Sequence, residues 1–392
     1  MSLDVFERAE IRFILACLRS RAGAGEELPC SAERDGLDWD YILKASICHG
    51  VLPHIHRALS QEKQLNLPER FRQELQGAFR AGARKNLQFT GELLRLTDLL
   101  SAAGIRAVPH KGPALAAFIY DDISMRQFGD LDIIIEPHDL GHARDVILAS
   151  GYKPRDDVEP EEGIYRRLGS EYVLERADGF VRVELHWQLS PAGDSSYMTP
   201  ASVMGRCKSI SLCGRVVPAM SAEDQLLLTA VHGGSHIWER LGWIYDTAIL
   251  AETRDDMDWD AVMSVASRLG YRRLLLLALH LADDLMKARI PEKMAVEARS
   301  DADVASLAAV VYRYLQRPAP EIEDIPLRRR FSLMSRERRR DRMHFLANLA
   351  VSPSLEDWQS MPLPAKLFPL YHIVRPFRLT LKHFRIAKRT KT

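Results

Sequence analysis

The sequence predicts an α+β protein in which a small mixed β-sheet lies between an N-terminal and a C-terminal helical region. Apolar residues recur at helical spacing over the first hundred residues and again beyond Pro191. Between these stretches the chain carries short β-prone runs and an Asp178-Gly179 pair, which is typical of a hairpin turn. With 392 residues, 46% of them hydrophobic, the chain is long enough for about two or three domains.

Residues 1–103 are expected to form the N-terminal helical region. Apolar spacing over 6–18 predicts a first helix, which a Gly-rich stretch ends. A second helix, capped by an aspartate, is expected over 38–55, and Pro53 should end or kink it. A longer third helix is expected over 69–100, because apolar residues recur there after Pro68. Gly104 should end this helix.

Residues 104–190 are expected to form the sheet-containing core, because helical spacing gives way here to short β-prone runs and turn residues. In order, we expect a strand at 105–108, a turn at Lys111-Gly112-Pro113, a helix at 114–120, a strand at 131–135, a helix at 138–150, and two strands at 172–174 and 180–187.

Residues 191–310 are expected to form a helical domain, and residues 311–392 a basic C-terminal helical segment. Eight arginines lie within 328–342, and no acidic residue occurs from 358 to 392. Such a segment can bind an anionic partner such as RNA, a glycan or an acidic membrane surface. A solvated helix face is the ordinary explanation of the same charge pattern.

Composition and motifs exclude several classes. Fifty-four basic against 53 acidic residues leave a formal charge of +1, so the total charge gives no reason to expect a nucleic-acid-binding protein. Five cysteines without a CxxC pair argue against a disulfide framework and a Cys-rich zinc site. The chain shows no secretion signal, no membrane span and no GxxxxGK[ST] phosphate loop. We therefore expect a cytoplasmic protein.

Three acidic residues are the candidate metal ligands and catalytic groups. Asp130 and Asp132 are two residues apart, so a strand would present both on one face, and Glu184 lies on the polar face of a later strand. Magnesium prefers such oxygen ligands and commonly binds one or two carboxylates together with phosphates. Two acids at this spacing arise by chance about seven times in a chain of this composition, so the surrounding strand-turn-helix pattern carries the prediction.

The order of a glycine turn, an Asp-x-Asp strand and a third acid on a later strand resembles the nucleotidyltransferase superfamily related to DNA polymerase β. More narrowly, five segments look like a family of uncharacterised, mostly bacterial nucleotidyltransferases, and the resemblance runs from about Leu37 to Arg375-Pro376. These segments read KGPALAAFIY, RQFGDLDIII, VELHWQL, EDQLLLTAVHGG and GWIYDTAIL. The resemblance implies a nucleotidyltransferase core flanked by helical regions.

The resemblance assigns roles to individual residues. Asp130 and Asp132 match the paired metal ligands, and Glu184 matches the third acid, which helps the metal and the deprotonation of an acceptor hydroxyl. Gly112 matches the glycine of a phosphate-binding turn. Two departures from the broad superfamily occur: the third acid is a glutamate where aspartate is usual, and Pro113 follows the glycine where serine is frequent.

Pro113 lacks a backbone N–H, so the triphosphate is expected to depend on Lys111 or Arg126 instead. The alternative interpretations are that Lys111 only faces solvent and that Arg126 only pairs with nearby acids. His186 shares a strand face with Glu184, so it can orient that carboxylate, contact substrate or serve as a structural hydrogen-bonding residue.

Three polar residues of the later helical region are further candidates. His232, His236 and Asp246 can line a base or acceptor pocket, although helix-face and capping roles are the more common ones. They do not have the spacing of a zinc site.

The function expected from these residues is transfer of a nucleoside monophosphate from an NTP, ATP among them, to a hydroxyl-bearing acceptor, with Mg²⁺ or Mn²⁺ as cofactor. A small molecule, a glycan precursor, a protein and an RNA all remain open as acceptors. Two alternatives are a binding module with little catalysis and a toxin-like transferase that acts on tRNA.

Overall fold

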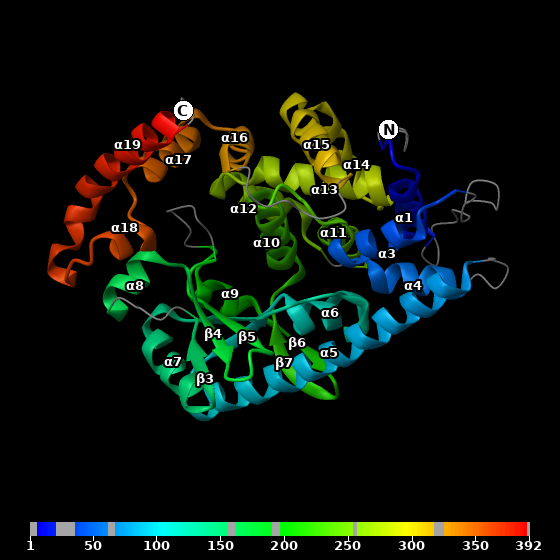
Figure 1. The fold of residues 1–392 in the computed structure, drawn as a ribbon, viewed down its shortest axis with the longest axis horizontal. Helices are drawn as coiled ribbons and strands as arrows, with labels where there is room; N and C mark the ends of the chain where they lie inside the picture. Colours follow the sequence, from blue (N-terminus) through cyan, green and yellow to red (C-terminus); the bar gives the residue numbers. More distant parts are fainter. Residues whose placement is uncertain are drawn as a thin grey trace.

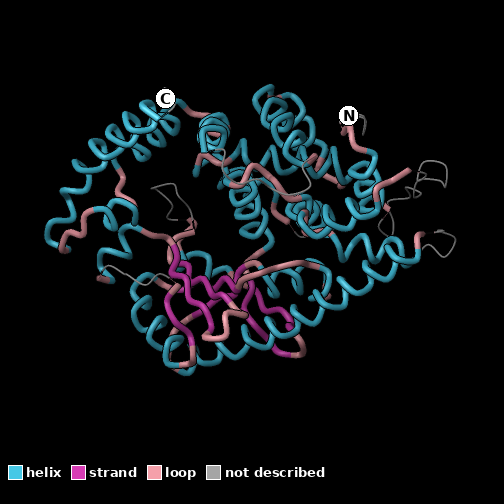
Figure 2. The backbone as a smooth tube through the Cα atoms, in the orientation of Figure 1, coloured by secondary structure: helices cyan, strands magenta, loops and turns pink. Residues whose placement is uncertain are grey.

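The computed structural model describes residues 6–20, 36–61, 67–155, 161–189, 197–253, 257–316 and 325–389, with side chains described up to residue 380. A five-stranded sheet and a two-stranded sheet lie beside a long helix, and further helices surround them (Figure 2). This arrangement confirms the predicted α+β class with a mixed sheet between helical regions. Across the described residues, every helix is too short or too polar to cross a membrane.

The N-terminal region contains four described helices, namely α1 (Ala9–Arg19), α3 (Trp39–Cys48), α4 (Leu52–Gln61) and α5 (Glu69–Ala102). The single helix expected over 38–55 is in fact two, because Gly50 adopts a positive φ of 70° between α3 and α4. Pro53 lies in the first turn of α4, where its missing N–H removes no helical hydrogen bond. The 34-residue α5 runs under the sheet and reaches the N-terminal helices (Figure 1).

The main sheet has the strand order β1-β2-β5-β4-β3. Its strands are β1 (Ala107–His110), β2 (Leu131–Ile135), β3 (Tyr152–Pro154), β4 (Glu171–Arg176) and β5 (Arg182–His186). Strands β2 and β5 are parallel, and the other neighbouring pairs are antiparallel. The intervening helices are α6 (Gly112–Tyr120), η2 (Ile123–Met125), η3 (Pro137–Asp139), α7 (Leu140–Ala149) and α8 (Glu162–Leu168).

The two faces of this sheet differ in chemistry. One face is apolar and shares a buried core with α5 and α7. Its side chains include Leu131, Ile133, Ile135, Val183 and Leu185. Because side chains alternate along a strand, the residues between these project from the opposite face. That opposite face carries the acidic residues of the candidate site.

A second, two-stranded sheet was not predicted from the sequence. Strands β6 (Lys208–Leu212) and β7 (Arg215–Ala219) follow the short helix α9 (Pro200–Arg206), in a region that was expected to be helical throughout. Cys213 and Gly214, with φ of 50° and 80°, form the two-residue turn. Positive φ at both central residues matches the twist of a hairpin, but cysteine is an uncommon first residue of such a turn.

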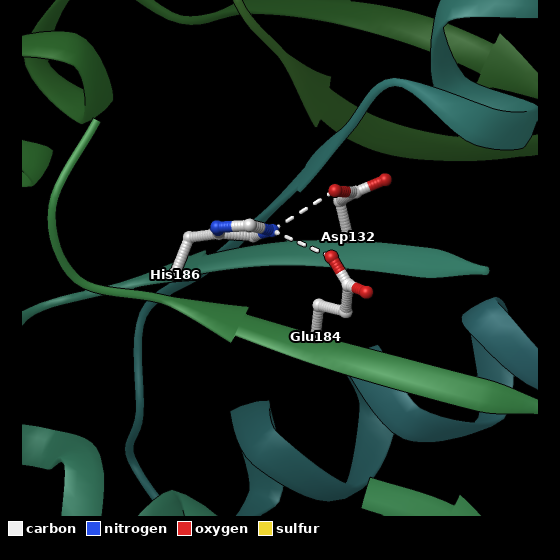
Figure 3. Close-up of side chains that lie close together, drawn as sticks. All are labelled: Asp132, Glu184 and His186. Carbon is white, nitrogen blue, oxygen red and sulfur yellow. Dashed lines mark hydrogen bonds and ion pairs between the residues drawn. The ribbon is translucent and has the colours of Figure 1, made fainter. Parts of the chain in front are cut away.

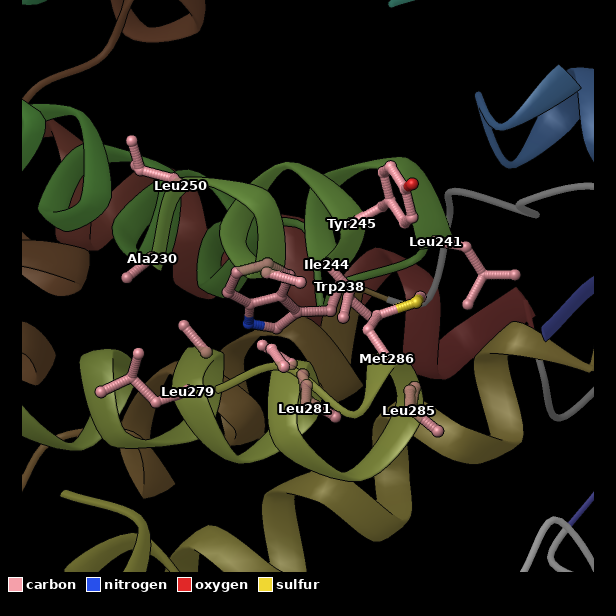
Figure 4. Close-up of a cluster of buried hydrophobic side chains, with 14 of the residues drawn as sticks. Ala230, Trp238, Leu241, Ile244, Tyr245, Leu250, Leu279, Leu281, Leu285 and Met286 are labelled. Carbon is pink, nitrogen blue, oxygen red and sulfur yellow. The ribbon is translucent and has the colours of Figure 1, made fainter. Parts of the chain in front are cut away.

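The following region is helical, as predicted. It comprises α10 (Ala222–Ser235), α11 (Leu241–Thr253), α12 (Trp259–Leu269), α13 (Arg272–Met286), α14 (Glu292–Ser300) and α15 (Ala302–Leu315). Ser221 caps α10 by accepting a hydrogen bond from the amide of Asp224. Trp238 is fully buried among side chains of α10, α11 and α13 (Figure 4). The same core includes apolar residues of α1, α3 and α4, so the N-terminal helices and these later helices pack together.

The basic C-terminal segment forms α16 (Ile325–Met334), α17 (Arg339–Val351), α18 (Leu355–Ser360), η4 (Ala365–Leu370) and α19 (Tyr371–Arg389). Asp357 is buried and accepts hydrogen bonds from Arg375 and Arg378, which joins α18 to α19. A small core of Ile164, Trp358, Phe368 and Tyr371 packs α8 against this segment. The four-part division of the chain at residues 103, 190 and 310 stays a prediction.

Candidate active site

Strand pairing aligns Asp132 of β2 with Glu184 of β5. The two residues are register partners on adjacent parallel strands, so their carboxylates project from the same face. His186 lies two residues after Glu184 and therefore also faces this side. On the other flank of β2, His110 of β1 is the register partner of Asp132. A polar row thus crosses the centre of the sheet.

The three side chains shown in Figure 3 converge on one point. The Nε2 atom of His186 lies 2.9 Å from Oδ1 of Asp132 and 3.6 Å from Oε2 of Glu184. Each residue offers one ligand atom, and these atoms all lie within 4.8 Å of one another. Asp132 and His186 are buried, and Glu184 is half-buried. Two carboxylates and an imidazole in this arrangement could hold a metal ion.

Electrostatics favour a cation at this point. Burial, followed by the nearby carboxylates of Asp132 and Glu171, raises the pKa of Glu184 to about 7. Burial and then the charge of Asp132 also raise the pKa of Asp130. Carboxylates that resist ionisation next to one another are stabilised in the charged form by a divalent cation. The cluster of Asp132, Glu184 and His186 therefore suits a divalent cation.

Lys111 supplies a positive charge from within the protein. Its Nζ lies 3.0 Å from Oδ1 of Asp132. Burial alone would raise the pKa of Asp132, but the ammonium of Lys111 and the hydrogen bond with His186 hold that pKa well below its ordinary value. Lys111 therefore pairs with an acid of the site and does not simply face solvent.

The turn that carries Lys111 has an unusual backbone. Lys111 adopts φ 53° and ψ −146°, in a region that is almost restricted to glycine. Gly112 follows with φ 44°, and a Cβ there would lie 3.5 Å from the carbonyl oxygen of Asp130. Helix α6 begins at Gly112 with Pro113 in its first turn, as predicted. The turn therefore aims the N-terminus of α6, which carries a partial positive charge, at the acidic face of the sheet.

Asp130, which was predicted as a metal ligand, lies outside the group of converging side chains. It precedes β2 and is only partly buried. Among the described residues, the group whose ligand atoms converge contains Asp132, Glu184 and His186, but not Asp130. Asp130 still contributes charge, since it raises the pKa of both Glu184 and Lys111.

Arg126 contacts an acid from a distant part of the chain. Its Nε lies 2.9 Å from Oδ2 of Asp246 on α11, and both side chains are nearly buried. The hydroxyl of Tyr120 donates to the other oxygen of Asp246 at 2.7 Å. The backbone carbonyl of Arg126 accepts a hydrogen bond from the side chain of Asn86. Pairing with an acid was the alternative considered for Arg126, but the partner is Asp246 rather than Asp130 or Asp132.

His232 of α10 and His236, the residue directly after α10, are close enough to Lys111 for its charge to affect both. Burial, followed by the charge of Lys111, lowers the pKa of His232 well below its ordinary value. Burial and then Arg328 lower the pKa of His236 to about 4. The two rings lie 4.7 Å apart and both contact the ring of Trp243. The helical region thus presents neutral imidazoles near Lys111.

Two residues of the site were not predicted from the sequence. His110 is buried beside Lys111, and Glu171 of β4 is the register partner of His186. The position of His110 directly before the Lys111-Gly112 turn was an available signal for the first. The hairpin pairing of the strands on either side of Asp178-Gly179 was the signal for the second, because register across a hairpin follows from its turn.

The fold and the site together define a nucleotidyltransferase-type α+β protein, with carboxylates on adjacent strands beside a glycine turn that opens a helix. A family model described as uncharacterised nucleotidyltransferase matches residues 35–287. This match spans more than half of the chain, and the chain belongs to that family. Comparison with curated proteins found no match.

Proposed function

We propose that this protein is a magnesium-dependent enzyme that transfers a nucleoside monophosphate from an NTP to a hydroxyl-bearing acceptor. The observation that carries the proposal is the pairing of Asp132 with Glu184 on parallel strands, directly beside the Lys111-Gly112 turn. Membership of a nucleotidyltransferase family supports the same reaction class. Mn²⁺ is the second metal that this proposal includes.

Asp132 and Glu184 are the proposed metal ligands, and Asp130 adds negative charge at the open end of β2. Bound Mg²⁺ would neutralise phosphate charge and polarise the α-phosphate of the NTP. Since Asp132 is buried and fixed within the sheet, its carboxylate can hold a ligand in one defined orientation. Glu184 is less buried and is therefore closer to an incoming substrate.

We assign proton transfer to Glu184. In the proposed reaction the acceptor oxygen forms a bond to the α-phosphorus, and the bond to the leaving pyrophosphate breaks. The acceptor's proton passes to a carboxylate oxygen of Glu184. Because Glu184 is the less buried of the two proposed metal ligands, its carboxylate can reach the acceptor hydroxyl and accept this proton.

Lys111 and Gly112 are the proposed phosphate-binding residues. When a divalent cation neutralises Asp132, the ammonium of Lys111 becomes available for the β- and γ-phosphates. The backbone N–H of Gly112 opens α6 and can donate to the same group. For Arg126 a phosphate contact stays a prediction, because its Nε donates to Asp246.

The acceptor is proposed to approach from the side of α10. His232 and His236 face the Lys111 side of the sheet and, being uncharged at neutral pH, can hydrogen-bond a hydroxyl group. The proposal covers a small molecule, a glycan precursor, a protein side chain and an RNA end as acceptors. RNA is the acceptor that would also use the arginines of α16 and α17.

Calorimetric titration of ATP, GTP, CTP and UTP with Mg²⁺ tests the proposal. The wild type should bind at least one nucleotide in a metal-dependent manner, and Asp132→Asn should weaken that binding at least about tenfold. Asp145→Asn on α7 is the control, because this carboxylate is exposed and lies outside the site. Equal binding by Asp132→Asn and the wild type would contradict the proposal.

A further inference from the structure

His186 has an acidic residue near each of its two ring nitrogens. Its Nε2 faces the carboxylates of Asp132 and Glu184, as described above. Its Nδ1 lies 3.5 Å from Oε2 of Glu171 on β4. The ring is 10% exposed, so the strands on both sides hold its orientation. His186 therefore bridges the proposed metal ligands and a third carboxylate behind them.

A carboxylate near Nδ1 suits a metal-binding histidine, whose second nitrogen is then free to face the metal. A neutral imidazole carries its proton on one nitrogen and a lone pair on the other. In the tautomer with its proton on Nδ1, the N–H would lie beside Glu171, and the lone pair of Nε2 would point at Asp132 and Glu184. A lone pair beside two carboxylates is repelled unless a cation lies between them. Histidines that bind metals usually donate their second N–H to a carboxylate in this manner, which fixes the tautomer and the ring orientation.

We propose that His186 is a nitrogen ligand of the metal held by Asp132 and Glu184, that Glu171 orients it, and that the centre consequently binds Mn²⁺ more tightly than Mg²⁺. Mg²⁺ accepts oxygen ligands almost exclusively and loses its bound water reluctantly. First-row transition metals bind imidazole readily, and a nitrogen among the ligands shifts selectivity towards them. This inference rests on the proposed function only in that both use the same metal centre.

Metal binding without nucleotide is the direct test. Titration calorimetry with Mn²⁺ alone and Mg²⁺ alone should give at least about tenfold tighter binding of Mn²⁺ to the wild type. His186→Gln replaces the nitrogen donor with an amide oxygen and should lower Mn²⁺ affinity about 10- to 100-fold while changing Mg²⁺ affinity little. Glu171→Gln retains the ring but weakens its partner, so it should lower Mn²⁺ affinity by a smaller factor.

His138→Gln is the matched control, since this histidine is 76% exposed and lies in η3, outside the site. It should bind both metals as the wild type does. Equal losses of Mn²⁺ and Mg²⁺ affinity in His186→Gln would overturn the inference, because they would indicate a structural role of the ring. Tighter binding of Mg²⁺ than of Mn²⁺ by the wild type would also overturn it.

A spectroscopic measurement on the wild type does not depend on the folding of any variant. Electron spin-echo spectra of bound Mn²⁺ should show modulation from a directly coordinated ¹⁴N nucleus. Spectra without this coupling would refute ligation by His186 even if His186→Gln failed to fold. Nucleotide transfer without ¹⁴N coupling would leave the proposed function intact and contradict ligation by His186. Conversely, ¹⁴N coupling without metal-dependent nucleotide binding would support ligation by His186 and contradict the proposed function.

Discussion

The ammonium of Lys111 lies 3.0 Å from Oδ1 of Asp132, and this contact joins the turn before α6 to strand β2. The contact depends on a backbone conformation that lysine rarely adopts, with φ 53° and ψ −146°. Backbone strain of this kind is usually found at functional sites, where the surrounding structure maintains it. The backbone conformation that positions the ammonium should therefore lower the free energy of unfolding by a measurable amount.

Substitution of Lys111 should separate its charge from its backbone strain. Lys111→Gly and Lys111→Ala both remove the ammonium, and both should weaken nucleotide binding. Lys111→Gly should be more stable than Lys111→Ala by about 1 kcal/mol, because glycine relieves the strain but loses more entropy on folding. Urea unfolding of the two variants measures the difference. Equal stability, or a more stable alanine variant, would show that the backbone at this residue is not strained.

The ion pair between Arg126 and Asp246 should be important for stability. Asp246→Asn leaves a nearly buried guanidinium without its carboxylate and weakens the hydrogen bond from Tyr120. We expect a loss of roughly 3 kcal/mol in the free energy of unfolding. Chemical denaturation provides the measurement, with the exposed Asp260→Asn as the control. A loss no larger than that of the control would indicate that the pair contributes little to the packing of α6 and the segment after η2 against α11.

Gly233 is required by the packing of Trp238. A Cβ at Gly233 would lie 2.5 Å from a ring carbon of the fully buried Trp238, so Gly233→Ala should destabilise the protein by about 1 to 3 kcal/mol. Gly77 lies within α5 with open space around it, and Gly77→Ala should instead stabilise by up to about 1 kcal/mol. Thermal unfolding should give shifts of opposite sign, and shifts of the same sign would contradict this account.

Acid should destabilise the protein in part through His236. Its pKa falls from 6.5 to about 4 on folding, because burial and the charges of Arg328, Lys111 and Arg240 disfavour its protonated form. A depressed pKa means that the folded state binds fewer protons, so the contribution of His236 is fully present above pH 6.5 and is lost as the pH falls towards 4.

Stability measured as a function of pH tests this contribution. His236→Gln should lose less stability than the wild type between pH 6.5 and 4. His138→Gln, which changes an exposed histidine, should follow the wild type. Parallel curves for His236→Gln and the wild type would show that His236 is not held neutral.

Local patterns account for the part of the site that the sequence could predict. The alternation of apolar residues around Asp132 marks a buried strand with an acid on its other face, and Glu184 lies in a similar run. A glycine before a helical run marks the turn at Gly112. Each of these signals lies within a few residues of the group that it predicts.

Contacts between distant residues could not be predicted in this way. Arg126 and Asp246 are 120 residues apart, and no local pattern pairs them. The β6–β7 hairpin was missed because its turn uses Cys213 where asparagine or aspartate is usual. The group of Asp132, Glu184 and His186 becomes evident only once the register of three strands is known. The start of β2 at Leu131 likewise explains why Asp130 is not part of this group.

The most direct test of the proposed nucleotidyl transfer follows the α-phosphate. NTPs labelled with ³²P at the α or the γ position are incubated with the protein, Mg²⁺ and a fractionated cell extract as the source of acceptors. We expect the α-label to enter a product and the γ-label to enter pyrophosphate. Asp132→Asn should abolish both, whereas Asp145→Asn should not. Entry of the γ-label into the product, or full activity of Asp132→Asn, would contradict it.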